Sequence, residues 1–320
     1  MRNVTAVTLC CRVKITVCLL LALLFFYASD IKAQDSPFIL VLSSQESEPY
    51  VQARKGFEEQ LTKSFPNADF LYHQVVKGEK VAPSQVFSGT KAQQPAAILS
   101  LGISAAEYAQ TSFPDYPLVA TMLLKKSTLK RIKDHSGILL HFPVKMQLLW
   151  LSKFLPEAKR VGILYDPALN SDWVKEAENS AQDMGFEIIA LGASTPKELQ
   201  SGLKNISKKA DVLLAIPDQT VYSGKTAKQV LLFTYRNRIP FVGLSAPWVK
   251  AGALYALEVD YRDLGRQAAE LIKKNLEGTP PKTDMSHPEK ITYSVNSKII
   301  NHLHLEIDPD LIKGASRVFK

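Results

Sequence analysis

Short apolar segments alternate with helical patterns along nearly the whole chain from Phe38 onward, and this alternation restricts the fold most strongly. The segments have the length and β-branched composition of strands, whereas the stretches between them repeat apolar residues at helical spacing. Because strands that alternate with helices form parallel βαβ units, we predict an α/β protein with mostly parallel sheets.

The expected strands fall into two series of similar size. The first series comprises residues 38–43, 69–75, 96–102, 118–124 and 137–142, and the second comprises 160–165, 186–191, 211–216, 240–244 and 253–259. Two series of this kind favour two similar lobes over one long sheet.

Capping residues predict where three of the helices begin. Thr195 precedes Pro196 and Glu198 with the spacing of a capping box. Ser171 and Asp260 each stand before a run with helical apolar spacing, so we expect each of them to be an N-cap.

The C-terminal part is expected to combine an extended connection with a last strand. Residues 279–290 contain three prolines and no apolar periodicity, so we expect a segment that passes between the lobes, followed by a strand at 291–295. His302 and His304 would share one face of a strand, a spacing that zinc can use. No third ligand is evident, so we treat them as surface histidines and predict no metal site.

The first 33 residues have the layout of a secretory signal peptide. The basic residues Arg2, Arg12 and Lys14 precede an apolar run at 15–27, and small residues follow it up to Ala33. The run is shorter than the ~20 residues that a membrane-crossing helix needs. We therefore expect a signal peptide at 1–33, cleavage after Ala33 and a periplasmic mature protein, with a retained N-terminal anchor as the alternative.

Composition narrows the chemistry of the mature chain. All three cysteines lie in the leader, which excludes thiol catalysis and cysteine-based metal sites in the remainder. The formal net charge of +8, part of it in the leader, is too weak to indicate nucleic-acid binding. There is no glycine-rich phosphate loop, nucleophile elbow or zinc-protease motif. We therefore predict a protein that is not an enzyme and has no cofactor.

Open parallel α/β sheets bind ligands beyond the carboxyl ends of their strands, where loops present polar groups and free backbone N–H groups. Small polar side chains recur at these places in both series. The candidate ligand-binding residues are Ser43, Ser44, Gln45, Tyr50, Gly102, Ser104, Asn170, Ser171, Asp218, Thr220, Ser245 and Trp248.

Each kind of candidate side chain could contact a ligand in a particular way, and some of them could instead have only a structural role. Hydroxyl and N–H groups can hold a carboxylate, Asp218 can pair with an ammonium or a hydroxyl, and Tyr50 or Trp248 can cover an apolar body. In the alternative interpretation, Ser104 and Ser171 only cap helices, and Trp248 only packs against the hinge.

Five segments match the pattern of one protein family in order and spacing: residues 155–167, 170–171, 249–254, 259–267 and 293–298. They resemble the type I periplasmic solute-binding proteins of ABC transporters, and within them the branch that includes tryptophan/tyrosine-type binding proteins. The resemblance implies two Rossmann-like lobes joined by a three-crossing hinge. The crossings would lie near Phe142 and Pro143, near Glu258, and before Ile291.

The resemblance also implies the extent of each lobe. Lobe 1 would comprise residues 36–142 plus 258–288, including a helix that begins at Tyr261, and lobe 2 would comprise residues 143–257 plus 289–320.

The function implied is capture of a small-molecule ligand by lobe closure. The ligand would be an amino acid or a related small carboxylate, which a monomeric protein delivers to an ABC permease in the inner membrane. One alternative is a periplasmic sensing module that docks on a membrane signalling receptor. The other is an enzyme on the same scaffold, for which Asp166 with Asp218 is the acid/base pair to nominate.

Three places depart from the family pattern and bear on the ligand. Ile103 stands where threonine is common, residues 123–126 replace an Asp-Pro pair, and His141 with Phe142 replaces a more polar pair. These apolar and basic substitutions leave open a different ligand, anionic or less polar.

Overall fold

The computed structural model describes residues 36–320 except 79, 88–93, 125, 130–134 and 280–283. The predicted leader at 1–33, with its cysteines and cleavage site, lies outside the described residues. Within the described ranges, no helix combines the length and apolar character needed to cross a bilayer.

The first sheet contains six described strands, all parallel, in the order β11-β5-β4-β3-β1-β2. These are β1 (Phe38–Ser43), β2 (Asp69–Gln74), β3 (Ala97–Leu101), β4 (Leu118–Leu123), β5 (His135–Leu139) and β11 (Asp284–Ser286). The helices of this lobe are α2 (Glu48–Ser64), α3 (Pro83–Val86), α4 (Ile103–Ser112), the 3-10 turn η2 (Lys126–Leu129) and α10 (Tyr261–Leu276).

The second sheet has the order β13-β12-β10-β9-β8-β6-β7 among the described residues. Its strands are β6 (Arg160–Tyr165), β7 (Glu187–Gly192), β8 (Val212–Leu214), β9 (Phe241–Val242), β10 (Tyr255–Val259), β12 (Ile291–Asn296) and β13 (Arg317–Phe319). All neighbours are parallel except β12, which runs antiparallel to β10.

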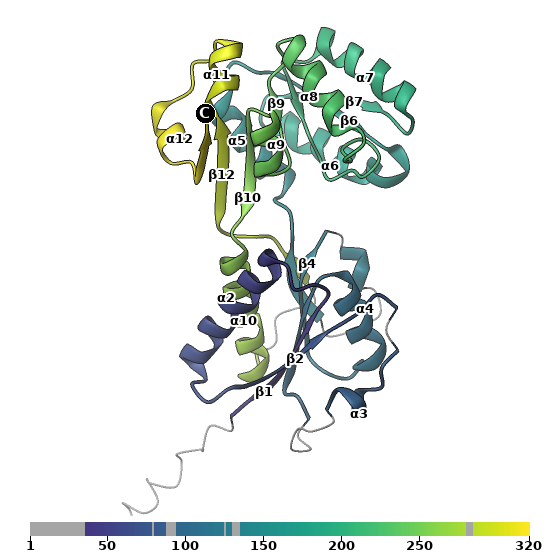
Figure 1. The fold of residues 1–320 in the computed structure, drawn as a ribbon, viewed down its shortest axis with the longest axis vertical. Helices are drawn as coiled ribbons and strands as arrows, with labels where there is room; N and C mark the ends of the chain where they lie inside the picture. The colour runs from purple at the N-terminus through teal and green to yellow at the C-terminus, as the bar shows by residue number, and fades with distance from the viewer. Residues whose placement is uncertain (1–35, 79, 88–93, 125, 130–134, 280–283) are drawn as a thin grey trace, which may run out of the picture.

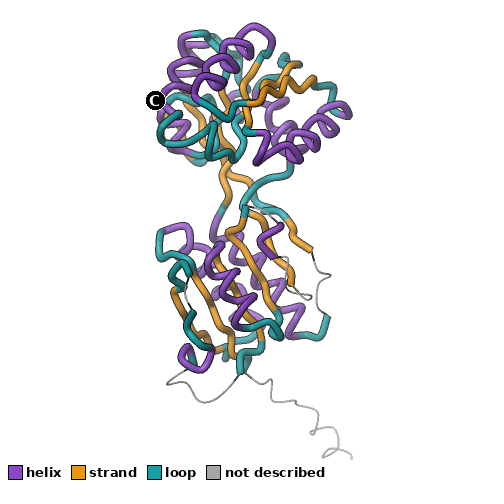
Figure 2. Tube along the Cα trace, turned by 90° about the vertical axis from the view of Figure 1, so that its right-hand side faces the viewer, coloured by secondary structure: helices purple, strands orange, loops and turns teal. Residues whose placement is uncertain are grey.

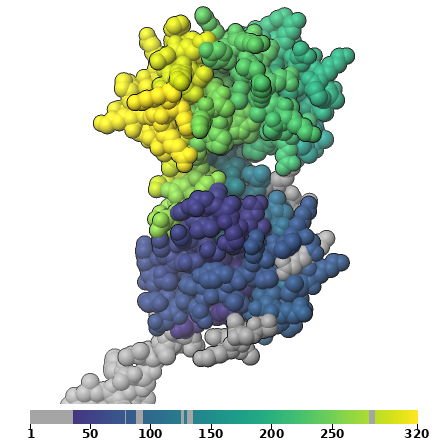
Figure 3. All heavy atoms as spheres, in the orientation of Figure 1, coloured from purple at the N-terminus to yellow at the C-terminus, as the bar shows by residue number. Residues whose placement is uncertain are grey.

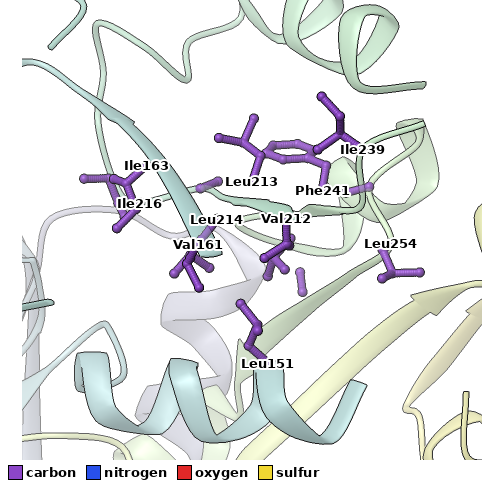
Figure 4. Close-up of a cluster of buried hydrophobic side chains, with 14 of the residues drawn as sticks. Leu151, Val161, Ile163, Val212, Leu213, Leu214, Ile216, Ile239, Phe241 and Leu254 are labelled. Carbon is purple, nitrogen blue, oxygen red and sulfur yellow. The ribbon is translucent and has the colours of Figure 1, made fainter. Parts of the chain in front are cut away.

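The helices of the second lobe are α5 (Val144–Phe154), α6 (Pro167–Asp183), α7 (Pro196–Lys209), α8 (Ala227–Arg236), α9 (Ala246–Ala251), α11 (Ser297–Leu303) and α12 (Pro309–Lys313). Figure 4 shows the core of this lobe. Leu151 of α5 packs toward Val161 and Val212 on one face of the sheet, while Leu213 and Phe241 lie on the other.

The two lobes stand one above the other and are joined by a narrow waist (Figure 1, Figure 2). The described chain passes through the waist three times: from β5 to α5, from β10 to α10, and from β11 to β12. The architecture is therefore the expected α/β fold of two lobes with mostly parallel sheets.

Helix α10 belongs to the first lobe although it follows a strand of the second, as the resemblance implied. It packs along α2 over one face of the first sheet. The approach is so close that a Cβ at Gly56 would lie 1.8 Å from the Arg262 carbonyl oxygen, and one at Gly265 would lie 1.8 Å from that of Ala53. Only glycine fits at these two positions.

Most expected strands are confirmed, with shifts at their ends, and two short strands were missed. Strand β5 starts at His135 rather than 137, β11 lies inside the proline-containing stretch, and β13 lies near the C-terminus. His302 lies in the last turn of α11 and stacks on Tyr235 at 3.9 Å between ring centroids, and His304 is the C-cap of this helix, so the strand geometry expected for the two histidines is wrong.

Two of the three predicted helix beginnings are confirmed. Thr195 and Glu198 form the capping box, and the Asp260 side chain accepts from the Asp263 N–H. The prediction for Ser171 is wrong, because Asp166 caps α6 five residues earlier and Pro167 occupies the first turn. Ser171 Oγ instead donates to the Pro167 carbonyl oxygen at 2.6 Å.

Candidate functional site

A cavity of about 520 Å³ lies at the waist between the lobes. Strands β5 and β10 run directly into the waist, so every strand parallel to them within its sheet ends at the edge that faces the other lobe. The cavity wall includes Leu124 and Gln52 of lobe 1, Leu214 and Ser245 of lobe 2, and crossing residues such as His141. The space-filling view shows this waist from one side (Figure 3).

Two of the crossings contact each other directly at this cavity. The rings of His141 and His287 lie 5.0 Å apart, and His287 Nδ1 donates to the His141 carbonyl oxygen at 2.9 Å. The Lys290 ammonium lies 2.7 Å from the Asp260 carboxylate. Burial raises the pKa of Asp260, but Lys290 and backbone N–H groups more than offset this, so the net shift is downward. These contacts join the crossings into one unit.

The lobe 1 candidates gather around the beginning of α4. The Ser44 hydroxyl accepts from the Ala105 N–H at 2.9 Å. Gly102 has φ +89°, and a Cβ there would lie 2.8 Å from both Ser44 Oγ and the Tyr50 hydroxyl. The structure thus brings Ser44, Tyr50 and Gly102 together from three segments, and half-buried Ser104 lies in the adjoining helical turn.

Two other candidates lie in the loop after β1. Ser43 is buried, and its hydroxyl donates to the Gln45 carbonyl oxygen at 2.6 Å, so it shapes the loop. The Gln45 side chain is exposed. Burial, followed by the nearby Tyr261 hydroxyl, raises the pKa of Tyr50, so its hydroxyl stays protonated at neutral pH.

In lobe 2, Asp218 joins the loops after β6 and β8. Its carboxylate is 3% exposed and accepts hydrogen bonds from four groups: the N–H groups of Asp166, Thr220 and Val221, and the amide of Asn170. Both oxygens of the Asp218 carboxylate therefore already accept hydrogen bonds from the protein. Contact between Asp218 and a solute therefore stays a prediction.

Asn170 and Thr220 support the same loops. Asn170 has non-helical angles, φ −133° and ψ 16°, and interrupts α6. The Thr220 hydroxyl donates to Asp166 Oδ2 at 2.9 Å, and this bond is the main reason why the pKa of Asp166 is lowered. Both carboxylates of the Asp166–Asp218 pair already accept hydrogen bonds from donors in these loops.

The remaining two candidates belong to α9. Ser245 occupies the N-cap position of α9 and lines the cavity, with no side-chain capping bond. Trp248 packs edge-on against Tyr222 and Phe241, at 6.0 and 5.9 Å between ring centroids. Trp248 therefore contributes to the core of lobe 2 and does not line the cavity.

The sequence interpretation assigned no ligand contact to β10, although four of its residues line the cavity: Tyr255, Leu257, Glu258 and Val259. The Tyr255 ring is fully buried and stacks on Phe154 at 4.0 Å, and its hydroxyl has no hydrogen-bond partner among the described residues. The Glu258 carboxylate is half-buried. A charged residue inside an otherwise apolar strand was the signal that could have identified Glu258.

The chain is similar in sequence and in fold to several known proteins. A curated tyrosine-binding protein from Clostridioides difficile is 24% identical over 273 residues, which cover 80% of this chain and 79% of that protein. The ligand-free, open structure of a substrate-binding protein with adhesive properties from Clostridium difficile has a TM-score of 0.71 and 22% identity, covering 89% of this chain and 99% of the other.

A further solved structure, an ABC domain from Streptococcus pneumoniae in complex with L-Trp, has a TM-score of 0.58 and 19% identity over 89% of this chain and 100% of the other. At these identities the structures establish the shared two-lobe fold. The profile of the family described as "ABC transporter substrate binding protein" matches residues 72–319. Because this match spans well over half of the sequence, the chain belongs to the ABC transporter substrate-binding protein family.

Proposed function

We propose that this protein captures an amino acid or a related small carboxylate between its lobes and delivers it to the permease of an ABC transporter. The observation that carries the proposal is the cavity at the waist, whose wall includes residues of both lobes and of two of the three crossings. Its volume of about 520 Å³ lies within the ~300–1,000 Å³ typical of small-molecule sites. The names of the two relatives that bind tyrosine and tryptophan support the same ligand class.

The cavity wall suits a solute with an apolar body. Leu124, Leu140, Leu244 and Leu257 contribute apolar surface, while Ser245 adds a hydroxyl. A carboxylate on the ligand would meet hydroxyl groups at the strand ends, such as those of Ser44 and Ser104 in lobe 1, which closure of the lobes would bring to the ligand. These residues, with Tyr50 and Gly102, are the lobe 1 contacts that we propose.

Capture would proceed by closure of the lobes about the three crossings. Ile103 at the edge of lobe 1 is 49% exposed, and Leu169 at the edge of lobe 2 is 46% exposed. Closure over a solute would cover such apolar side chains, which favours the closed state. Ligand contacts made only in the closed state would then set the population of the two states.

The finer assignments follow from the same proposal. Residues 36–142 plus 258–288 would move as one lobe and residues 143–257 plus 289–320 as the other. The protein would act as a monomer without enzymatic activity, in the periplasm, after removal of the signal peptide at 1–33.

The experiment is a thermal-shift screen of chain 34–320 against amino acids, aromatic acids, small anions and nucleosides. A solute at ~100 times its Kd should stabilise the protein by about 2.7 kcal/mol. A large shift with an amino acid or carboxylate supports the proposal, whereas shifts confined to anions without carboxylate or to nucleosides contradict the ligand class.

A matched pair of variants tests the lobe 1 contacts. Gly102→Ala and Gly78→Ala both place an L side chain at a positive φ, which is +89° at Gly102 and +80° at Gly78. Only the new Cβ at position 102 would meet Ser44 and Tyr50, whereas nothing lies within 4 Å at position 78. We expect Gly102→Ala to lose binding and Gly78→Ala to retain it; equal affinity would remove these residues from the site.

A further inference from the structure

Two charged side chains on the cavity wall already have a partner of opposite sign. Asp260 is paired with Lys290 at 2.7 Å, and Arg262 is paired with Glu59. Among the described residues, no cation forms an ion pair with the remaining carboxylate on the wall, that of Glu258. The cavity between the lobes therefore contains one carboxylate that no cation in the described part of the chain neutralises.

The Glu258 carboxylate is nevertheless held in a fixed position. Oε1 accepts from the Ala246 N–H at 3.1 Å, and Oε2 accepts from the Ser294 hydroxyl. The Thr292 hydroxyl also donates to the Glu258 backbone carbonyl at 3.0 Å, which ties β10 to β12 at this point. Each carboxylate oxygen keeps a further lone-pair site for a second donor.

Arg317 also lines the cavity and has no ion-pair partner among the described residues, yet it does not balance this charge. Its side chain is exposed, so water screens it, whereas Glu258 is half-buried and is screened less. A half-buried carboxylate without a counter-ion is costly, and a cation that arrives with the ligand would relieve that cost.

We propose that Glu258 selects a ligand that bears a protonated amine, by accepting a charge-assisted hydrogen bond from that amine. This inference rests on the proposed function and specifies the polar end of the ligand. The leucines of the cavity wall would cover the apolar part of the same molecule. An anionic ligand without an amine, which the basic substitutions of the sequence left open, is disfavoured next to this carboxylate.

The test uses three probes that differ in one group each: L-tyrosine, tyramine, which lacks the carboxylate, and 3-(4-hydroxyphenyl)propanoate, which lacks the amine. Affinities are measured by calorimetry for the wild type, Glu258→Gln and Glu157→Gln. The glutamine keeps the size of the side chain and an amide oxygen that accepts from Ala246, but it removes the charge. Glu157 is exposed and remote from the cavity, so its variant controls for the change in net charge.

We expect the wild type and Glu157→Gln to bind L-tyrosine about 10- to 100-fold more tightly than the amine-free acid. In Glu258→Gln this preference should disappear, while affinity for the amine-free acid is unchanged or higher. A uniform loss of affinity for every probe would show a structural role for Glu258 and would overturn the inference. A preference that survives in Glu258→Gln would also overturn it and would leave the proposed function intact.

The wild type alone provides a second measurement if Glu258→Gln does not fold. Tyramine should then bind more tightly than 3-(4-hydroxyphenyl)propanoate, and the reverse order would overturn the inference. If none of the three probes binds, the assignment to Glu258 fails together with a tyrosine-like ligand. This outcome differs from one in which the wild type binds the probes but shows no preference for those that carry an amine.

Discussion

From the close contact between α2 and α10 we predict how a substitution in this contact changes the free energy of unfolding and ligand binding. In Gly265→Ala the new Cβ would lie 1.8 Å from the Ala53 carbonyl oxygen, about 1.5 Å inside an ordinary C···O contact. The helices must separate by a similar distance. Overpacking of this severity costs up to about 3 kcal/mol, and alanine returns about 1 kcal/mol of helix propensity, so we expect a net loss of about 2 kcal/mol.

The assay separates the two lobes. All three tryptophans, Trp150, Trp173 and Trp248, lie on helices of lobe 2, so their fluorescence reports that lobe, whereas far-UV circular dichroism reports both. We expect Gly265→Ala to lower the urea midpoint seen by circular dichroism. The fluorescence midpoint should move less, unless the lobes unfold together.

The control for this prediction is Gly224→Ala, a position with no atom within 4 Å of the added Cβ. It should be neutral or slightly stabilising. Because α10 starts with Tyr261 and Arg262 in the cavity wall, Gly265→Ala should also weaken ligand binding. A Gly265→Ala protein as stable as the wild type would refute the close packing on which this reasoning depends.

Three other perturbations test the account. Asp218→Ala leaves four donors without their acceptor, so we expect the free energy of unfolding in urea to fall by at least about 3 kcal/mol and ligand binding to be lost. The control Asp172→Ala, on the exposed surface, should be neutral. An Asp218→Ala protein as stable as the wild type would contradict the role of Asp218. Tyr255→Phe removes a buried hydroxyl that has no partner among the described residues and should raise stability by about 1 kcal/mol; a clear loss would show that the hydroxyl is satisfied. Arg160 lowers the pKa of Asp211 to about 2, so the stabilisation by the Arg160–Asp211 pair is present above the unfolded pKa of 3.8 and is lost as the pH falls through about 2. Asp211→Asn should therefore be less stable than the wild type at neutral pH and equal to it near pH 2. A difference in stability that persists near pH 2 would contradict this.

Regular patterns in the sequence predicted the main elements because local forces determine them. The apolar runs that became β1 and β6 match the structure at both ends, since burial on both faces of a parallel sheet requires continuous apolar residues. The capping box at Thr195 is a local motif for the same reason. By contrast, β11 and β13 are three-residue strands whose existence depends on pairing with β5 and β12, and no local signal announces them.

The site was predictable only as a set of loops. The rule that ligands bind beyond the carboxyl ends of parallel strands led to the loops that contain Ser44, Gly102 and Ser245. Which side chains face the cavity depends on contacts between distant segments: Asp218 looked available in sequence, yet four donors from neighbouring loops hold it. The sequence identified Glu258 only as a hinge position, and the folded cavity shows that no cation of the described residues pairs with it.

The most direct test of the central claim, capture of a solute by closure of two lobes, is small-angle X-ray scattering of the mature chain with and without a saturating solute from the thermal-shift screen. The account predicts a smaller radius of gyration with the solute, because the lobes approach each other about the three crossings. A solute that binds tightly and leaves the radius of gyration unchanged would contradict the account.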